Sequence, residues 1–263
     1  MITKFDLSTI KALILDLDGV LWRANEPIGD LAAIFRGIEG RGWKVVLATN
    51  NATHTIEQYV ERMASFGVGI QPWQVVHSGI AAARHLVELF PDGGPVYVMG
   101  EQGVVQALGE HGFFPAEEDV IAVVVGMDRK LSYDRLRKAT LFIRAGLPFI
   151  ATNPDRTFPT PEGLVPGAGA ILAALEAASY VTPYIAGKPA PEMYKIAMER
   201  LGVIPEEVLV VGDRPETDIA GAQALGCRTA LVLSGVVNNE EAELWKPPPD
   251  IICANLATIV QSD

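Results

Sequence analysis

The chain has 263 residues, of which 49% are hydrophobic and 20% are charged, so it is long enough for one sizeable core and a smaller second domain. Its net charge of −11 at pH 7 gives no attraction for a polyanion, which argues against nucleic-acid polymers and anionic membranes as partners. A small anionic ligand in a local cationic pocket stays compatible with this charge.

Short β-branched runs alternate with helical patterns along the chain, which is typical of an α/β fold with a parallel sheet and crossover helices. The predicted strands are 12–16, 44–48, 96–99, 121–125, 149–151, 184–186, 208–211, 230–233 and 251–253. The predicted helices span about 55–66, 79–90, 101–111, 132–145, 168–178, 191–201 and 217–225. The helix at 132–145 opens on Ser132 and is followed by Gly146, as helix caps require.

Four of these strands change from apolar to polar residues at their carboxyl ends, in the runs "ALILDLD", "KVVLATNN", "PYIAGKP" and "VLVVGDRPETD". Ligands of open parallel sheets bind outside the carboxyl ends of the strands. We therefore expect the four edges to converge on one site that holds Asp16, Asp18, Thr49, Asn50, Lys188, Asp213 and Asp218.

The pair Asp16 and Asp18 suggests the chemistry. In an extended segment, residues two apart point to the same side, so one carboxylate would attack while the other manages a proton. Gly19 removes a Cβ where the backbone comes close to a ligand. Carboxylates alone would repel an anion, so a cation is needed, and Asp16 and Asp213 offer the oxygen ligands that Mg²⁺ prefers. These residues suit phosphoryl transfer to an aspartate.

Each motif can also be interpreted as a purely structural feature with no role in function. "DLDG" after a strand is often an Asp-rich turn, "TNN" is common in loops and caps, and "GDRPETD" is compatible with a turn and a capping acid. A lysine that precedes a proline, such as Lys188, is usually a solvent-exposed side chain when it is considered without the other motifs. Asn153 and Asp155 fit either a turn or a ligand contact, and "GAGA" at 167–170 fits either tight packing or anion binding. The joint order of the four motifs favours a functional site over coincidence.

The motifs "DLDGV", "ATNN", "GKP" and "GDRPETD", in this order, resemble those of the haloacid dehalogenase-like (HAD) phosphohydrolases. The segments "VVVGMDRKLSYDRL", "FIATNPD" and "LVPGAGAILAALE" resemble the α/β cap of subfamily IIA, which includes NagD-like nucleotidases, 4-nitrophenylphosphatases, and phosphoglycolate and pyridoxal phosphate phosphatases. The resemblance implies a Rossmann-like parallel-sheet core at 1–78 and 183–263, with a C2-type cap inserted at 79–182.

The resemblance also implies residue roles. Asp16 would be the nucleophile, Asp18 the general acid and base, and Lys188 would temper the charge on Asp16. The predicted phosphate ligands are Thr49, Asn50, Asn51, Gly19 and Lys188. Mg²⁺ would be held by Asp16, Asp213 and the backbone carbonyl of Asp18, with Asp218 in support. Dehalogenases of this superfamily lack an acid at the position of Asp18, which argues against dehalogenation.

The resulting reading is a Mg²⁺-dependent hydrolase of small-molecule phosphomonoesters. Two alternatives stay open, namely a phosphotransferase or mutase with the same aspartyl-phosphate, and a catalytically idle binding or regulatory protein. The sequence does not choose among nucleotides, sugar phosphates, phosphoglycolate and pyridoxal phosphate as substrates. The resemblance allows a homodimer through the apolar face of the cap.

The amino-terminal sequence and the cysteines bear on location. The opening "MITKFDLSTI" lacks the charged and apolar regions of a signal peptide, and no run of about 18 apolar residues occurs. Cys227 and Cys253 lie in apolar neighbourhoods outside any CxxC pair, which favours reduced structural thiols. We expect a cytoplasmic protein.

Overall fold

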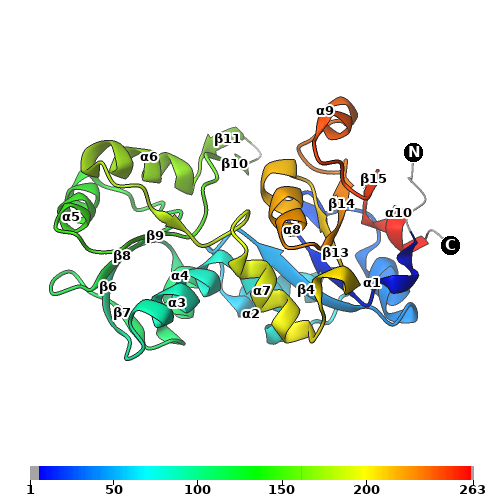
Figure 1. Cartoon of the computed structure of the whole chain (residues 1–263), viewed down its shortest axis with the longest axis horizontal. Coiled ribbons are helices and arrows are strands. Elements are labelled where there is room, and N and C mark those ends of the chain that lie inside the picture. The colour runs from blue at the N-terminus through cyan, green and yellow to red at the C-terminus, as the bar shows by residue number, and fades with distance from the viewer. Residues whose placement is uncertain (1–5, 161, 262–263) are drawn as a thin grey trace. The chain divides into compact units, whose positions relative to one another are not determined.

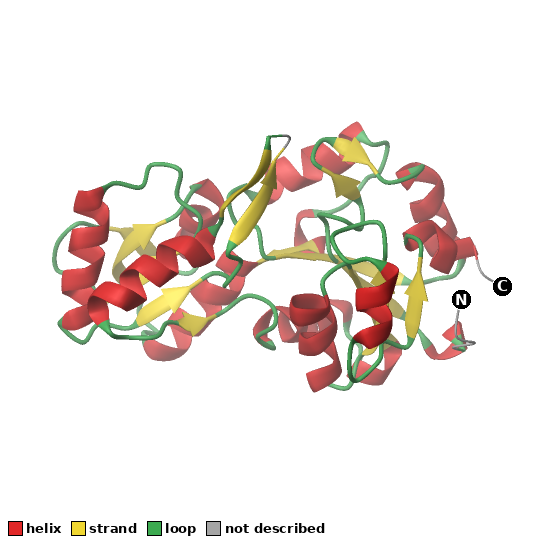
Figure 2. Cartoon of the chain, turned by 90° about the horizontal axis from the view of Figure 1, so that it is seen from above, coloured by secondary structure: helices red, strands yellow, loops and turns green. Residues whose placement is uncertain are grey.

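The structure is a computed structural model that describes residues 6–160 and 162–261. Helices and strands alternate along much of the chain, as Figure 2 shows in red and yellow. The chain divides into two compact units, the first comprising residues 1–49, 57–76 and 194–263 and the second residues 50–56 and 77–193. The predicted boundaries of a catalytic core and a cap describe functional domains, and they stay a prediction.

The first unit is built on a six-stranded sheet in the order β15-β14-β13-β1-β4-β5. The pairs from β15 to β4 are all parallel. Strands β1 and β13 are buried along their whole lengths, as expected for central strands of a sheet covered on both faces. The α/β class is confirmed. The strands are β1 (Ala12–Leu15), β4 (Lys44–Thr49), β5 (Val75–His77), β13 (Val208–Gly212), β14 (Arg228–Val232) and β15 (Ile251–Cys253).

Several helices accompany this sheet (Figure 1), and the chain also forms one small ribbon. The ribbon consists of the antiparallel strands β2 (Trp22–Arg23) and β3 (Glu26–Pro27). Short 3₁₀ turns lie at Leu7–Thr9, Pro72–Gln74 and Pro205–Glu207. The α-helices are α1 (Leu31–Gly40), α2 (Ile56–Ser65), α7 (Glu192–Leu201), α8 (Ala220–Ala224), α9 (Asn239–Leu244) and α10 (Leu256–Gln261).

Helix α1 was not predicted, because two glycines weaken its helical pattern. The structure gives a reason for one of them, since a Cβ on Gly37 would lie 2.5 Å from Cγ1 of Val260 in α10. The close approach of two helices therefore requires a glycine there. Asp30 caps the helix by accepting a hydrogen bond from the Ala33 backbone N–H at 2.9 Å.

The segment predicted as one helix at 217–225 has a different form. It begins earlier, with one π-helical turn at Pro215–Ile219, and continues as α8. Within that turn the Asp218 carboxylate accepts a hydrogen bond from the Arg214 backbone N–H at 3.1 Å. The wider turn carries Asp218 on its inner side, where the residue is buried.

The second unit contains a five-stranded parallel sheet in the order β12-β9-β8-β6-β7. Helices α3 and α4 lie on one side of it and α5 and α6 on the other (Figure 1). An antiparallel ribbon joins β10 (Thr157–Thr160) to β11 (Gly163–Pro166). The remaining strands are β6 (Gly94–Met99), β7 (Phe113–Pro115), β8 (Ala122–Val125), β9 (Phe149–Ala151) and β12 (Tyr184–Ile185), and the helices are α3 (Ser78–Leu89), α4 (Gln102–Gly109), α5 (Tyr133–Arg144) and α6 (Ala168–Ser179).

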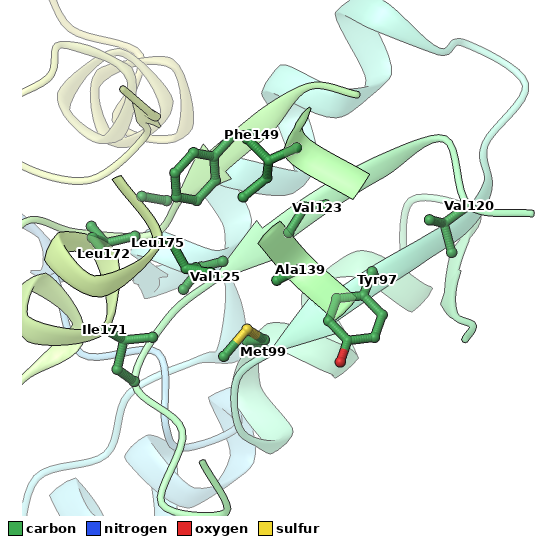
Figure 3. Packing of buried hydrophobic residues seen from close by; sticks show 12 residues of the cluster. Tyr97, Met99, Val120, Val123, Val125, Ala139, Phe149, Ile171, Leu172 and Leu175 are labelled. Atoms are coloured by element: carbon green, nitrogen blue, oxygen red, sulfur yellow. The ribbon is translucent and has the colours of Figure 1, made fainter. Parts of the chain in front are cut away.

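A compact hydrophobic cluster joins the second sheet to α5 and α6 (Figure 3). The sheet contributes residues two apart, which share one face of a strand. Those residues are Tyr97 and Met99 of β6, Val123 and Val125 of β8, and Phe149 and Ala151 of β9. The helices contribute Ala139, Ile143, Ile171, Leu172 and Leu175. The cluster fixes the register of α5, whose predicted cap at Ser132 is confirmed by a hydrogen bond from the Arg135 backbone N–H at 3.3 Å.

Strand β12 differs from the prediction in one respect. The sequence suggested that it ends at the same sheet edge as the strands before Asp16, Thr49 and Asp213. Instead it pairs in parallel with β9, so it belongs to the sheet of the second unit. The motif that contains Lys188 therefore follows a strand of a different sheet from the other three motifs.

Within the part of the chain that the structure describes, none of the helices has the length and apolar character needed to cross a bilayer.

Candidate active site

Three of the predicted motifs meet at one edge of the first sheet. Strands β13, β1 and β4 are parallel neighbours, with Leu15 opposite Val211 on one side and Leu47 on the other. Their carboxyl ends therefore lie together. Asp16 directly follows β1 and its backbone N–H still donates to the Val211 carbonyl at 2.9 Å. Asp213 directly follows β13, and β4 ends on Thr49.

The acids at this edge form a compact cluster. One carboxylate oxygen each from Asp16, Asp213 and Asp218 lies within 4.8 Å of the others, and this is the group of possible metal ligands among the described residues. Asp213 also accepts a hydrogen bond from the Val236 backbone N–H at 2.9 Å.

Two glycines make room for Asp213. A Cβ on Gly19 would lie 2.3 Å from Oδ2 of Asp213, and one on Gly235 would lie 1.9 Å from the same oxygen. Gly19 also has φ of +88°, a conformation that side chains with a Cβ rarely adopt. A close-fitting cradle of hard oxygen donors suits a small divalent cation such as Mg²⁺. Three carboxylates so close together would otherwise repel one another.

The side chain of Asp18 is not part of the group of three acids. The expectation that it shares a face with Asp16 assumed that the strand continues through it, but β1 ends at Leu15. The chain turns instead, and the Gly19 backbone N–H donates to the Trp22 carbonyl at 2.7 Å. The Trp22 indole Nε1–H donates to Oδ1 of Asp18 at 3.0 Å. A buried tryptophan therefore orients the predicted general acid and base.

Lys188 is held by Asn50. The Asn50 Oδ1 accepts a hydrogen bond from the Lys188 backbone N–H at 2.8 Å, and its Nδ2 donates to the Lys188 carbonyl at 3.0 Å. Both residues are buried. Asn51, the next predicted phosphate ligand, accepts hydrogen bonds from the Thr53 backbone N–H at 3.0 Å and from its hydroxyl at 2.7 Å. Its side chain therefore shapes the loop after β4.

The two open questions about the second unit have structural answers. The Asn153 Nδ2 donates to the Asn50 carbonyl at 2.8 Å, so this residue supports the "TNN" loop. The glycines at 167–170 are tightly packed, because a Cβ on Gly167 would lie 2.4 Å from the Asp155 carbonyl oxygen and one on Gly169 would lie 2.3 Å from the Pro154 carbonyl oxygen. These contacts favour packing as the reason for the "GAGA" run.

Comparison with known proteins identifies the family. A family model described as haloacid dehalogenase-like hydrolase matches residues 13–114, and a second model, described as HAD-hydrolase-like, matches residues 185–259. The curated 5′-nucleotidase YutF of Bacillus subtilis is 36% identical over 89% of this chain and 91% of its own length. The chain belongs to the haloacid dehalogenase-like hydrolase family. The acid sugar phosphatase of Staphylococcus aureus is also 36% identical, over 91% of this chain and 92% of its own length.

Solved structures agree with this assignment. A 4-nitrophenylphosphatase from Thermotoga maritima matches with a TM-score of 0.92 and 32% identity, covering 97% of this chain and 98% of its own. A glycerol phosphate phosphatase from Mycobacterium tuberculosis in complex with magnesium matches with a TM-score of 0.90 and 30% identity, covering 98% of this chain and 79% of its own. The predicted class, a HAD phosphatase of subfamily IIA, is confirmed.

Sequence reasoning missed two residues that surround the acids of this phosphatase. Burial raises the pKa of Tyr59 well above its ordinary value, and the nearby charges of Asp18 and Asp16 add to this shift. Tyr59 also has a side-chain hydrogen bond with Thr49. The guanidinium of Arg62 stacks 4.1 Å over the ring of Trp22, and burial lowers its pKa while Asp18 opposes that shift. Their positions in α2, one turn apart, are the only sequence signal for them.

Proposed function

We propose that this HAD phosphatase hydrolyses small-molecule phosphomonoesters with the help of Mg²⁺, through an aspartyl-phosphate formed on Asp16. The observation that carries the proposal is the cluster of Asp16, Asp213 and Asp218 at the carboxyl ends of β1 and β13. Asp16 and Asp213, together with the backbone carbonyl of Asp18, would hold the cation. When bound, Mg²⁺ neutralises the negative charge that otherwise keeps a carboxylate away from a phosphate.

In the first half of the proposed reaction, a carboxylate oxygen of Asp16 bonds to phosphorus as the bond from phosphorus to the ester oxygen breaks. Asp18 gives its proton to the departing alkoxide, which leaves as an alcohol. Thr49 and Lys188 hold the transferring phosphoryl oxygens, and the lysine ammonium stabilises their negative charge. The hydrogen bond from Trp22 keeps Asp18 in a fixed orientation for this proton transfer.

In the second half, Asp18 takes a proton from a water molecule, whose oxygen attacks the phosphorus of the aspartyl-phosphate. The bond from phosphorus to Asp16 breaks, which releases inorganic phosphate and restores the carboxylate. Asp18 ends the cycle protonated, ready for the next ester. Exclusion of other water from the site is the role we assign to residues 79–182, the proposed cap.

The substrate class follows from the family and from charge. The relatives named above include a 5′-nucleotidase, an acid sugar phosphatase and a glycerol phosphate phosphatase, so small organic phosphates are the substrates to test. The chain's net charge of −11 is compatible with such ligands in a cationic pocket and unfavourable for nucleic-acid polymers. The cytoplasmic location and a homodimer through the cap stay predictions.

The deciding experiment is phosphate release from a panel of nucleoside monophosphates, sugar phosphates, glycerol phosphate, phosphoglycolate, pyridoxal phosphate and 4-nitrophenyl phosphate. It compares Mg²⁺ with EDTA, and the wild type with Asp16→Asn. The proposal requires that release depends on both Mg²⁺ and Asp16. Transfer to an added alcohol in preference to water would favour a phosphotransferase, and no release from any ester would favour a binding protein.

A further inference from the structure

The side chain of Asn50 pairs with the backbone of Lys188 in the way that two neighbouring strands pair. Its carbonyl oxygen takes the Lys188 N–H at 2.8 Å, and its amide nitrogen reaches the Lys188 carbonyl at 3.0 Å. The same amide nitrogen also lies 3.4 Å from Oδ2 of Asp155. An asparagine amide has two N–H donors, and these contacts engage both of them.

The surroundings of Asn50 hold this pairing in place. The Asn50 carbonyl accepts hydrogen bonds from the Ser78 hydroxyl at 2.6 Å and from the Asn153 amide at 2.8 Å. A Cβ on Gly187 would lie 2.6 Å from Oδ1 of Asn50 and 2.3 Å from the carbonyl oxygen of Thr152. The residue before Lys188 must therefore be a glycine for the pairing to form.

We propose that the side chain of Asn50 positions Lys188 and does not itself bind the phosphate. This inference rests on the proposed function, in which the Lys188 ammonium stabilises the phosphoryl group. The Lys188 ammonium is carried on a four-carbon stem, so its reach is set by the place of the backbone from which the stem extends. Asn50 fixes the Lys188 backbone at both its N–H and its carbonyl.

Under this proposal the Asn50 side chain is not the phosphate ligand that the sequence led us to expect. To bind a phosphate oxygen, the Asn50 side chain would have to offer an N–H donor, and its two donors point at Lys188 and Asp155. The carbonyl oxygen of the amide is an acceptor, which a phosphate dianion would repel. The Asn50 side chain therefore supports the Lys188 ammonium by holding the Lys188 backbone, and its own atoms take no part in the reaction.

A double-mutant cycle with Asn50→Ala and Lys188→Met separates the two roles. A displacement of about 1 Å at a catalytic group costs about 100-fold in rate, so Asn50→Ala is expected to lower kcat for 4-nitrophenyl phosphate about 100-fold. In the Lys188→Met background, the same change is expected to lower kcat by less than about threefold, because the ammonium that it positions is already absent. A direct phosphate ligand would instead give equal losses in both backgrounds, and that result would overturn the proposal.

Binding of orthovanadate, measured by calorimetry on the same four proteins, provides a readout that does not need turnover. We expect Asn50→Ala to weaken it only when Lys188 is present. The matched control is Asn255→Ala, which removes the hydrogen bond that the Thr258 backbone N–H donates to Asn255 Oδ1 at the start of α10 and should leave kcat unchanged. Should Asn50→Ala fail to fold, Asn50→Asp keeps the size, loses both donated hydrogen bonds and enters the same cycle.

Failure of this inference can be told apart from failure of the proposed function. If the wild type releases no phosphate, or Asp16→Asn is fully active, the proposed function is wrong. If the wild type is active, Asp16→Asn is inactive, and Asn50→Ala keeps wild-type kcat and orthovanadate affinity, only the role of Asn50 is wrong.

Discussion

Gly235 offers a sharp test of the proposed metal site, because it touches Asp213 and carries no side chain of its own. An alanine Cβ at this position would lie 1.9 Å from Oδ2 of Asp213, whereas ordinary contact begins at 3.4 Å. The Asp213 carboxylate would therefore have to move by about 1.5 Å. Such a movement would also break the hydrogen bond that it accepts from the Val236 N–H.

The expected consequences of Gly235→Ala are larger for activity than for stability. A displacement of this size should lower kcat/KM for 4-nitrophenyl phosphate by at least about 100-fold. Disturbing the surroundings of a metal ligand typically weakens metal affinity by about 10- to 100-fold, and we expect a loss in this range for Mg²⁺. Overpacking should cost about 1–3 kcal/mol in the free energy of unfolding, so the variant should still fold.

The assays are kcat/KM as a function of Mg²⁺ concentration and calorimetric titration of the protein with Mg²⁺. The control is Gly40→Ala, since Gly40 lies in α1 and a Cβ there would meet nothing within 4 Å. This control should keep wild-type kcat/KM and Mg²⁺ affinity. A folded Gly235→Ala protein with wild-type Mg²⁺ affinity and activity would refute the assignment of Asp213 as a metal ligand.

Three further predictions concern buried groups. Trp22→Phe removes the hydrogen bond to Asp18 and should lower kcat about tenfold, while Mg²⁺ affinity in calorimetry stays unchanged. Tyrosine ionises near pH 10 in the unfolded chain, but the raised pKa of Tyr59 keeps it neutral in the folded one, so wild-type stability should fall above pH 10. Urea unfolding at pH 8 and pH 10.5 should show that Tyr59→Phe loses about 0.8 kcal/mol less than the wild type over this interval. Burial raises the thiol pKa of Cys227 to about 12 and of Cys253 to about 11, so an aromatic disulfide reagent at pH 8 should label neither before unfolding; rapid labelling of the folded protein would contradict their burial.

Much of the fold could be predicted from the sequence, because strands buried on both faces have a distinctive β-branched composition. The runs at 12–16, 149–151 and 251–253 correspond closely to β1, β9 and β15. Some of the runs that were missed have mixed environments. Strand β7 is one example, since only Phe113 of its three residues is buried and the run offers no apolar pattern.

The candidate site was predictable only in part. Placing an acid after a strand requires nothing beyond the strand pattern, and this is how Asp16 and Asp213 were found. The partner of Asp18 depends on the turn that brings Trp22 back toward it, and the setting of Tyr59 depends on how α2 packs near the sheet. Such contacts arise from tertiary packing, which leaves no periodic signal in one sequence.

The glycines of this chain carry a signal that motif spacing does not. Gly19 and Gly235 both lie against Asp213, Gly187 lies against Asn50, and a Cβ on Gly212 would lie 2.1 Å from Cβ of Asp218. In each case a residue without a side chain stands where a buried polar side chain comes within contact distance of the backbone. A buried polar side chain needs a defined position, and a glycine beside it leaves the space that a Cβ would otherwise fill. A glycine beside a motif residue therefore indicates a supporting contact as well as a turn, and "GKP" and "GDRPETD" each begin with such a glycine. On this reasoning Gly212→Ala should disturb Asp218 as Gly235→Ala disturbs Asp213, and a comparison of Mg²⁺ affinity in the two variants would show which acid the cation depends on more.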